Sequence, residues 1–439
     1  MHASIDVRTT EAAALTDLAA ALCAAGHLKE GEPIPGGRAA EDSFSLGGSR
    51  STEEVSFYSR NRAVLALSLR YCELTSLPDS LGRLAGLRQL DLTGNQLCAL
   101  PESIRDLLDL QSLYLDENQL TSLPSSIEGL VGLRELHLDR NRLTSLPATL
   151  DRLTRLERLN ARGNRLGAVP ESLGHLTGLD DLRLGGNLLE SVPHALFRLT
   201  NLVTLDLSEN RLSSIPAGIG DLTRLQMLDL GHNELTSLPE ELGHLAGLSG
   251  YLYLSNNRLT SVPKSLGNLV KLAYLNITDN RLTSLPDTIG GLASLRELRL
   301  YNNHLADLPE SLGDLSNLRE LHLWNNELAS LPRSIGNLRS LRELRLQDNR
   351  LASLPASIGA LKRLSCLDLR NNKLIALPES LGDLSSLAQL DLRANRLVSL
   401  PDSIGDLANL EKLDLRWNKL SALPAWIHRL EQRGCAVLR

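Results

Sequence analysis

A period of 23 residues runs through most of this 439-residue chain. The repeated unit reads L-x-x-L-x-L-x-x-N-x-L-x-x-L-P-x-x-I/L-G-x-L-x-x, and two close copies begin at Leu133 and Leu341. Its asparagine recurs at positions 95, 118, 141, 164, 187, 210, 233, 257, 280, 303, 326, 349, 372, 395 and 418. Adding a degenerate first copy, with Cys72 in the asparagine position, gives 16 repeats. A fixed period of this length predicts one stacked array instead of two or three globular domains.

The L-x-L segment of each repeat predicts a short strand. Its two leucines alternate with polar residues, which is the period of a strand with one buried face. If each strand pairs in parallel with that of the next repeat, the sheet grows by about 4.8 Å per repeat and reaches roughly 75 Å. The asparagine after the strand should turn inward, where its amide can satisfy backbone groups of adjacent turns. We therefore assign it a structural role.

Proline and glycine mark the other side of each repeat. Of the 18 prolines, 16 occupy one repeat position, from Pro78 to Pro424. We expect this proline at the first position of a short helix, where its missing N–H costs nothing. We expect the glycine four residues later to end that helix in a backbone conformation that other residues avoid. This glycine occurs, for example, at Gly82, Gly174, Gly243 and Gly336.

The repeat resembles the leucine-rich repeat family over about residues 63–430. Its 23-residue form with LPxSIGxL is similar to the intracellular class that includes plant Ras-group-related proteins and the animal Ras-pathway scaffold. Several bacterial leucine-rich repeat proteins and secreted effectors use similar units. The resemblance implies an α/β repeat solenoid, a curved horseshoe with a parallel concave sheet and short convex helices or 3-10 turns.

The ends of the chain depart from the repeat. An open solenoid must cover the cores of its terminal repeats, and both ends carry segments suited to that. Residues 11–27 read as an alanine-rich helix with leucines on one stripe, Phe57 and Tyr58 are candidate lids, and Trp426 should face inward at the other end. The expected organisation is an N-terminal helix (1–27), a flexible linker (28–50), an N-terminal cap (51–62), the array (63–424) and a C-terminal cap (425–439).

Charge and cysteine usage exclude several classes of partner and compartment. A net charge of −6 and a pI near 6.0 argue against nucleic acid or an anionic membrane as the main partner. The five cysteines are scattered without paired spacing, which favours a reducing compartment. No cationic-then-apolar leader and no apolar run of about 18 residues is found. We expect a cytoplasmic protein, and the alternative is an effector secreted into a host cell.

No catalytic motif emerges from the sequence. It has no P-loop, no G-x-G-x-x-G after a strand, no H-E-x-x-H and no C-x-x-C, and its ten histidines are dispersed. We expect no cofactor, no metal and no enzymatic activity. Function should then lie in the variable positions of the strands, whose side chains point outward from the sheet.

Aromatic residues gather on a few of these strands. Eight of the ten tyrosines and tryptophans occupy strand or strand-exit positions, and five of them fall in repeats nine to twelve. Strand propensity explains their placement on strands but not their crowding into four neighbouring repeats. Exposed aromatics flanked by arginine and histidine are typical of binding hot spots. The candidate partner-binding residues are Tyr251, Tyr253, Tyr274, Arg299, Tyr301, His322, Trp324 and Arg345.

Two sets of charged residues favour a structural interpretation. Repeats fourteen to sixteen place three aspartates beside three arginines: Asp368, Asp391, Asp414, Arg370, Arg393 and Arg416. In repeats eleven to thirteen, Arg296, Arg319 and Arg342 precede Glu297, Glu320 and Glu343. Alternating columns of opposite charge neutralise each other, so we interpret both sets as self-paired, solvated surface.

One repeat is a residue longer than the others. In GLSGYLYL, three residues separate Leu248 from Leu252 where other repeats have two. Gly250 could absorb a bulge because it tolerates unusual backbone angles, and such a bulge would re-aim Tyr251. A random insertion is the alternative. The extra residue lies where the aromatic run begins, so we interpret it as the near edge of the binding surface.

These observations predict a monomeric, non-enzymatic scaffold that binds a folded protein on its concave face. The resemblance suggests a signalling role with a small GTPase or a signalling enzyme as partner. Two alternatives stay open: a bacterial effector acting in a host cell, and the substrate-recognition half of an enzyme such as a ubiquitin ligase.

Overall fold

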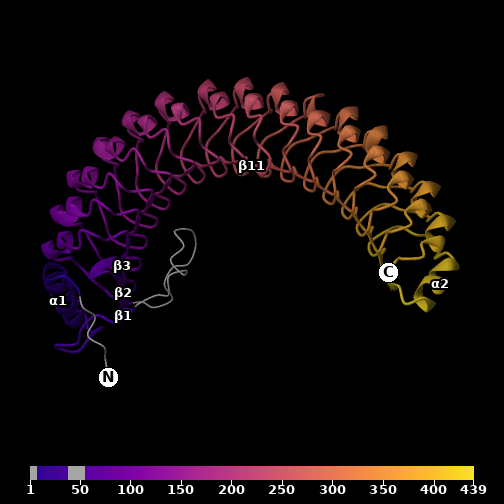
Figure 1. Cartoon of the computed structure of the whole chain (residues 1–439). Coiled ribbons are helices and arrows are strands. Elements are labelled where there is room, and N and C mark those ends of the chain that lie inside the picture. The colour runs from indigo at the N-terminus through magenta and orange to yellow at the C-terminus, as the bar shows by residue number, and fades with distance from the viewer. Residues whose placement is uncertain (1–6, 38–54) are drawn as a thin grey trace. The chain divides into compact units, whose positions relative to one another are not determined.

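The computed structural model describes residues 7–37 and 55–439 (Figure 1). It divides into two compact units, Met1–Arg211 and Leu212–Arg439, which are called here the N-terminal and the C-terminal unit. Each repeat contributes a short strand and, except in the last, a short 3-10 helix; in the last repeat an α-helix takes its place. Within each unit the strands line the concave side and the 3-10 helices the convex side (Figure 1). Each unit is therefore a curved solenoid, which confirms the expected fold class.

The N-terminal unit begins with α1 (Thr9–Ala24), β1 (Gly36–Gly37), β2 (Val55–Arg60) and β3 (Ala63–Leu69). Its repeat strands are β4 (Gln89–Asp91), β5 (Ser112–Tyr114), β6 (Glu135–His137), β7 (Arg158–Asn160), β8 (Asp181–Arg183) and β9 (Thr204–Asp206). Its 3-10 helices are Asp79–Arg83, Glu102–Asp106, Ser125–Gly129, Ala148–Arg152, Glu171–His175 and His194–Arg198. β2 pairs with β3 in antiparallel fashion, and from β3 to β9 each strand pairs in parallel with the next.

The C-terminal unit continues the same pattern. Its strands are β10 (Met227–Asp229), β11 (Tyr251–Tyr253), β12 (Tyr274–Asn276), β13 (Glu297–Arg299), β14 (Glu320–His322), β15 (Glu343–Arg345), β16 (Cys366–Asp368), β17 (Gln389–Asp391), β18 (Lys412–Asp414) and β19 (Ala436–Leu438). Its 3-10 helices are Ala217–Asp221, Glu240–His244, Lys264–Asn268, Ile289–Gly291, Glu310–Asp314, Arg333–Asn337, Ala356–Ala360, Glu379–Asp383 and Asp402–Asp406, followed by α2 (Trp426–Gln432). All neighbouring strands of this unit are parallel.

Leucines fill the core, and the asparagine column satisfies its polar backbone groups. Asn349 shows the pattern: its Nδ2 donates to the carbonyl oxygens of Leu323 (2.9 Å) and Leu346 (3.1 Å). Its Oδ1 accepts from the backbone N–H of Leu328 at 3.1 Å. Every asparagine thus connects its own turn to the preceding repeat, as the sequence predicted, and Asn349 is only 7% exposed.

The proline lies one position earlier than we predicted. Pro332 is the residue before its 3-10 helix and has an extended backbone (φ −64°, ψ 152°). Its carbonyl oxygen accepts the first helical hydrogen bond, from the N–H of Ile335 at 3.1 Å. Proline suits this position because its fixed φ matches extended backbone as well as helix, and the helix needs only its carbonyl.

We predicted that the convex glycines are needed for an unusual backbone conformation, and this reason was wrong. None of Gly82, Gly174, Gly243 and Gly336 has a positive φ. Instead, a Cβ placed on Gly174 would lie 2.2 Å from the carbonyl oxygen of Ala195, and one on Gly336 would lie 2.3 Å from that of Ser357. These positions are glycine because the backbone of the next repeat passes too close for a side chain.

Both ends carry packed segments beyond the repeats. Leu15, Leu18 and Leu22 of α1 are buried, as is Phe57 of β2. Part of the segment expected to be a flexible linker, residues 28–37, contains a buried Ile34 and the strand β1, which pairs with β2. The rest of that expected linker, from residue 38, and the first residues of the expected cap, to residue 54, lie outside the described residues. At the other end Trp426 is buried and β19 pairs with β18.

Candidate functional site

The strands of the C-terminal unit present two outward side chains each, and the residue two positions after the strand adds a third. Strand pairing brings equivalent residues side by side: Tyr251 faces Tyr274, and Arg299 faces His322. His322 in turn faces Arg345. The inward leucines between them are fully buried. The eight candidate residues therefore lie on one continuous face of β11 to β15 and their exits.

Three tyrosines form the first cluster on this face. The rings of Tyr251 and Tyr253 are 4.7 Å apart between centroids, and those of Tyr253 and Tyr274 are 5.1 Å apart. Both pairs are tilted, by 47° and 58°, a geometry that aromatic pairs favour. All three rings are half-buried, so part of their apolar surface is covered by their neighbours.

Arg299 joins this cluster to the next one. Its guanidinium carbon lies 5.5 Å from the ring centroid of Tyr274, and its Nε donates to Glu297 Oε1 at 2.5 Å. Burial raises the pKa of the Tyr274 hydroxyl, so the ring stays neutral. Burial alone would lower the pKa of Arg299, but the hydrogen bond to Glu297 and the nearby Tyr274 raise it. Arg299 is thus a fixed positive charge beside aromatic surface.

Tyr301 and Trp324 form the second cluster. Their rings are stacked, with centroids 4.2 Å apart and an angle of 10° between planes. They border a cavity of about 370 Å³ that is also lined by Arg299, His322 and Arg345, together with Glu320 and Glu343. A flat aromatic wall flanked by arginines is the composition found at the centre of protein interfaces.

A row of carboxylates lies on the same face. Glu297, Glu320 and Glu343 are register partners on consecutive strands. Arg345 Nε donates a hydrogen bond to Glu343 Oε1, which raises the pKa of the Arg345 guanidinium. In the middle repeat the arginine is replaced by His322, whose Nε2 lies 3.3 Å from Glu320 Oε2. Three carboxylates therefore face two guanidiniums and one imidazole.

Glu297, Glu320 and His322 are also residue types that bind metal ions. Their ligand-type atoms lie within 4.8 Å of one another. Glu297 is, however, already hydrogen-bonded to Arg299, and a guanidinium on the adjacent strand at Arg345 adds a second positive charge beside the group. Both charges oppose a metal cation, so the geometry fits an ion-paired surface better than a metal centre.

The sequence identified the aromatic and basic residues of this face but assigned the glutamates to other partners. We expected Glu297 and Glu343 to take part in a self-paired surface with the arginines that precede them. In the structure they pair with Arg299 and Arg345, two residues later, and the preceding arginines are exposed. Residues two apart in a strand share a face, and that spacing was the signal available for this pairing.

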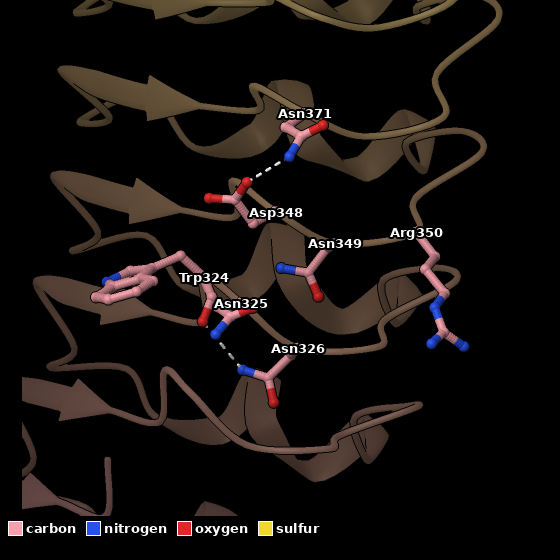
Figure 2. A pocket seen from close by; sticks show the side chains of 7 residues that line it. All are labelled: Trp324, Asn325, Asn326, Asp348, Asn349, Arg350 and Asn371. Carbon is pink, nitrogen blue, oxygen red and sulfur yellow. Dashed lines mark hydrogen bonds between the residues drawn. The ribbon is translucent and has the colours of Figure 1, made fainter. Parts of the chain in front are cut away.

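Sequence analysis also missed a second opening beside Trp324, lined by three consecutive repeat loops. It is lined by Trp324, Asn325, Asn326, Asp348, Asn349, Arg350 and Asn371 (Figure 2). A run of Asn and Asp residues immediately before the repeat asparagine, from Asn256 to Asn371 in six consecutive repeats, was the available signal.

The aspartates that end β16 to β18 do pair with the arginines two positions later. Arg393 contacts Asp391 at 2.6 Å and Asp414 at 3.2 Å, and Arg416 contacts Asp414 at 2.7 Å. Asp414 is fully buried, and although burial opposes its charge, the hydrogen bonds from Arg416 leave its pKa below the usual range. The self-pairing is as predicted, but the aspartates are less solvated than expected.

The extra residue lies just before β11. Three residue pairs connect most neighbouring strands, but β10 and β11 share only two, Leu228 with Leu252 and Asp229 with Tyr253. Gly250 has an ordinary φ, so it does not supply the unusual angle that we expected. A Cβ there would lie 3.0 Å from the carbonyl oxygen of Gln226. The insertion therefore removes one pair from the ladder next to Tyr251, and the close approach of Gln226 favours a residue without a side chain at this position.

Among residues 7–37 and 55–439, no helix is long and apolar enough to cross a membrane.

Family models match nearly the whole array. A leucine-rich repeat region matches residues 49–184 and 308–396, and further leucine-rich repeat models match residues 177–235, 200–249, 250–305 and 409–430. No curated protein sequence matches the chain.

Several solved structures are similar to this chain. A leucine-rich repeat protein of Leptospira interrogans is 38% identical, with a TM-score of 0.76, and the match covers 84% of this chain and 94% of that one. A plant peptide hormone receptor in complex with RGF2 is 32% identical, with a TM-score of 0.72, over 83% of this chain and 61% of the receptor chain. An internalin from Listeria monocytogenes is 25% identical, with a TM-score of 0.60, over 71% and 91%.

Proposed function

Because the chain belongs to the leucine-rich repeat family, whose members typically serve as binding modules, we propose that it is a non-enzymatic scaffold for a protein partner. The partner docks on the strand face from Tyr251 to Arg345, called here the aromatic face. The observation that carries this proposal is the stacked pair of Tyr301 and Trp324 above a cavity flanked by arginines. The solved structures similar to this chain include a plant peptide hormone receptor in complex with RGF2, which supports protein or peptide binding in general.

The geometry favours a folded partner with a protruding contact surface. The aromatic face spans five neighbouring strands, which at about 4.8 Å per strand is roughly 20 Å. Its rings are half-buried and held by each other and by Arg299, so few side chains need to be ordered on binding. A signalling role, with a small GTPase or signalling enzyme as partner, remains the proposal that the repeat class suggests.

The test is affinity purification with mass spectrometry from the source cells, with the wild-type chain and the Tyr301→Ala/Trp324→Ala variant as baits. We expect at least one protein to be recovered with wild type and to fall at least tenfold with the variant, because truncating a central aromatic typically costs about 2 kcal/mol or more of binding. The melting transition should stay nearly unchanged, since neither ring belongs to the leucine core.

The matched control is Tyr71→Ala/Trp417→Ala, which removes the same two residue types at positions 43% and 71% exposed outside the aromatic face. It should recover the partner as well as wild type does. Full recovery by the Tyr301→Ala/Trp324→Ala variant, or equal loss with the control, would refute the aromatic face as the docking surface.

A second candidate function is a bacterial effector delivered into a host cell. Its supporting observation is the similarity to leucine-rich repeat proteins of two bacteria. A reporter fused to residues 1–60 tests it in a secretion-competent bacterium: export of the reporter supports the effector function, and retention in the bacterium counts against it.

A further inference from the structure

A column of Asn and Asp residues lies beside the aromatic face. Six consecutive repeats of the C-terminal unit carry one of these residues immediately before the buried asparagine: Asn256, Asp279, Asn302, Asn325, Asp348 and Asn371. Each has a positive φ, between 53° and 58°. Asn and Asp tolerate this left-handed conformation better than other side chains, which explains their presence but not how their side chains are arranged.

The side chains of this column hydrogen-bond to one another in one direction. Asn302 Nδ2 donates to Asp279 Oδ1 at 2.6 Å, and Asn325 Nδ2 donates to Asn302 Oδ1 at 2.8 Å. Farther along, Asn371 Nδ2 donates to Asp348 Oδ1 at 2.5 Å. Each amide therefore donates to the residue of the preceding repeat.

The ladder stops between Asn325 and Asp348. A carboxylate has no N–H group, so Asp348 cannot donate to Asn325. Two acceptors, the amide oxygen of Asn325 and the free carboxylate oxygen of Asp348, are left on consecutive loops. Within the described part of the chain, no hydrogen bond reaches either of these two oxygens. Both side chains are exposed, so a donor from outside the chain can reach them.

A cavity opens at this break. It measures about 510 Å³ and is lined by Trp324 as well as by Asn325, Asp348 and Asn371. Figure 2 shows the Asp348 carboxylate and the Trp324 ring on the same side of the opening, toward the strands, and Arg350 on the opposite side. The guanidinium of Arg350 is paired with Glu327 at 2.9 Å, so its charge is engaged away from Asp348.

We propose that this cavity binds an arginine side chain of the protein partner. The guanidinium has several N–H donors in one plane, so it can donate to Asn325 and to Asp348 while its face lies against the Trp324 ring. One carboxylate and one amide oxygen fall short of the roughly six to eight oxygen ligands that Ca²⁺ takes, whereas they match a monovalent organic cation. The inference rests on the proposed function, because it assigns chemistry to one contact of the partner at the edge of the aromatic face.

The experiment uses the full chain labelled with 5-fluorotryptophan. Its three tryptophans, Trp324, Trp417 and Trp426, give three fluorine resonances that single Trp→Phe variants assign. The probe is N-acetyl-arginine amide, compared with N-acetyl-citrulline amide, its neutral isostere, and with N-acetyl-glutamate amide. We expect the arginine probe to shift the Trp324 resonance saturably and to bind about tenfold more tightly than the citrulline probe, because the charged hydrogen bond and the cation–π contact are both lost in citrulline.

Asp348→Asn is the decisive variant. Its new amide can donate to Asn325 and its oxygen can still accept from Asn371, so the ladder closes while the charge is removed. We expect about a tenfold loss of affinity for the arginine probe, with the melting transition unchanged or slightly raised. Asp279→Asn is the matched control: it removes the same charge from the same column, where Ser255 stands in the preceding repeat in place of Trp324. It should leave the affinity unchanged.

Three results would overturn the inference: an unmoved Trp324 resonance, equal shifts at Trp324 and Trp417, or equal effects of Asp348→Asn and Asp279→Asn. Its failure can be told from that of the proposed function. If the probe does not bind but the Tyr301→Ala/Trp324→Ala variant still loses the partner, the arginine contact is wrong and the docking surface stands. If the probe binds but that variant keeps the partner, the docking surface is wrong.

Discussion

Replacing Asn349 with alanine is expected to lower the free energy of unfolding by about 2 to 4 kcal/mol. The substitution leaves the buried N–H of Leu328 without its acceptor, and an unsatisfied buried group costs about 1 to 3 kcal/mol. The carbonyl oxygens of Leu323 and Leu346 each lose one of two amide donors, since Asn326 and Asn372 still donate to them, and the space left by the lost amide adds to the cost. Urea unfolding followed by circular dichroism measures the change.

Asn317→Ala is the matched control for this prediction. Asn317 is exposed, and its amide makes one hydrogen bond, to the carbonyl oxygen of Ala293 at 2.8 Å. Water can replace that bond, so its loss should cost no more than about 1 kcal/mol. Since repeat arrays can unfold in parts, hydrogen exchange of the Leu328 amide gives a local readout. Equal effects of the two substitutions would show that the asparagine column does not stabilise the array.

The second large effect is expected for Gly174→Ala, which should lower the free energy of unfolding by about 2 to 3 kcal/mol. The added Cβ would lie 2.2 Å from the carbonyl oxygen and 2.8 Å from the Cβ of Ala195. Because that carbonyl belongs to the backbone of the adjacent 3-10 helix, the clash cannot be relieved by turning a side chain. Thermal or urea unfolding of the full chain measures the loss.

The same repeat supplies the control for the glycine. Gly167 has no atom within 4 Å of an added Cβ and its φ is ordinary. Gly167→Ala should therefore be neutral or stabilising by up to about 1 kcal/mol, because alanine reduces the entropy of the unfolded chain. A neutral Gly174→Ala would mean that neighbouring convex segments have room to separate.

The fold could be predicted from the sequence because each repeat has the same pattern of residues. The alternation of leucines predicted the strands, and the repeat asparagine predicted that the buried backbone groups of the loops would be hydrogen-bonded. The reason for Gly174 could not be predicted, since the sequence shows where a glycine stands but not which atom lies opposite. The position of Pro332 was one residue off because proline fits both extended and helical backbone.

The aromatic face was predictable in its residues but only partly in its geometry. Clustering along the repeat placed Tyr301 and Trp324 at the exits of neighbouring strands, but the parallel stacking of their rings depends on side-chain torsions that no pattern encodes. From the sequence, Glu297 could pair either with Arg299 or with the arginine that directly precedes the glutamate. Only the outward direction of alternate side chains along the strand decides in favour of Arg299. The break at Asp348 depends on the direction of amide donors along a column, which appears only once neighbouring loops are in place.

The convex glycine has a consequence for the stiffness of the scaffold. In the C-terminal unit every repeat from Gly220 to Gly405 has glycine at this position, and each added Cβ would lie 2.1 to 2.7 Å from the following segment. In the N-terminal unit the position varies, with Arg105, Glu128, Asp151 and Phe197 among its occupants. The outer edge behind the aromatic face is thus closely packed repeat after repeat, and these steric contacts resist straightening of the curve and sliding between repeats. A partner that needs a flatter surface would therefore bind poorly there, so selectivity can come from the shape of the partner as much as from its side chains.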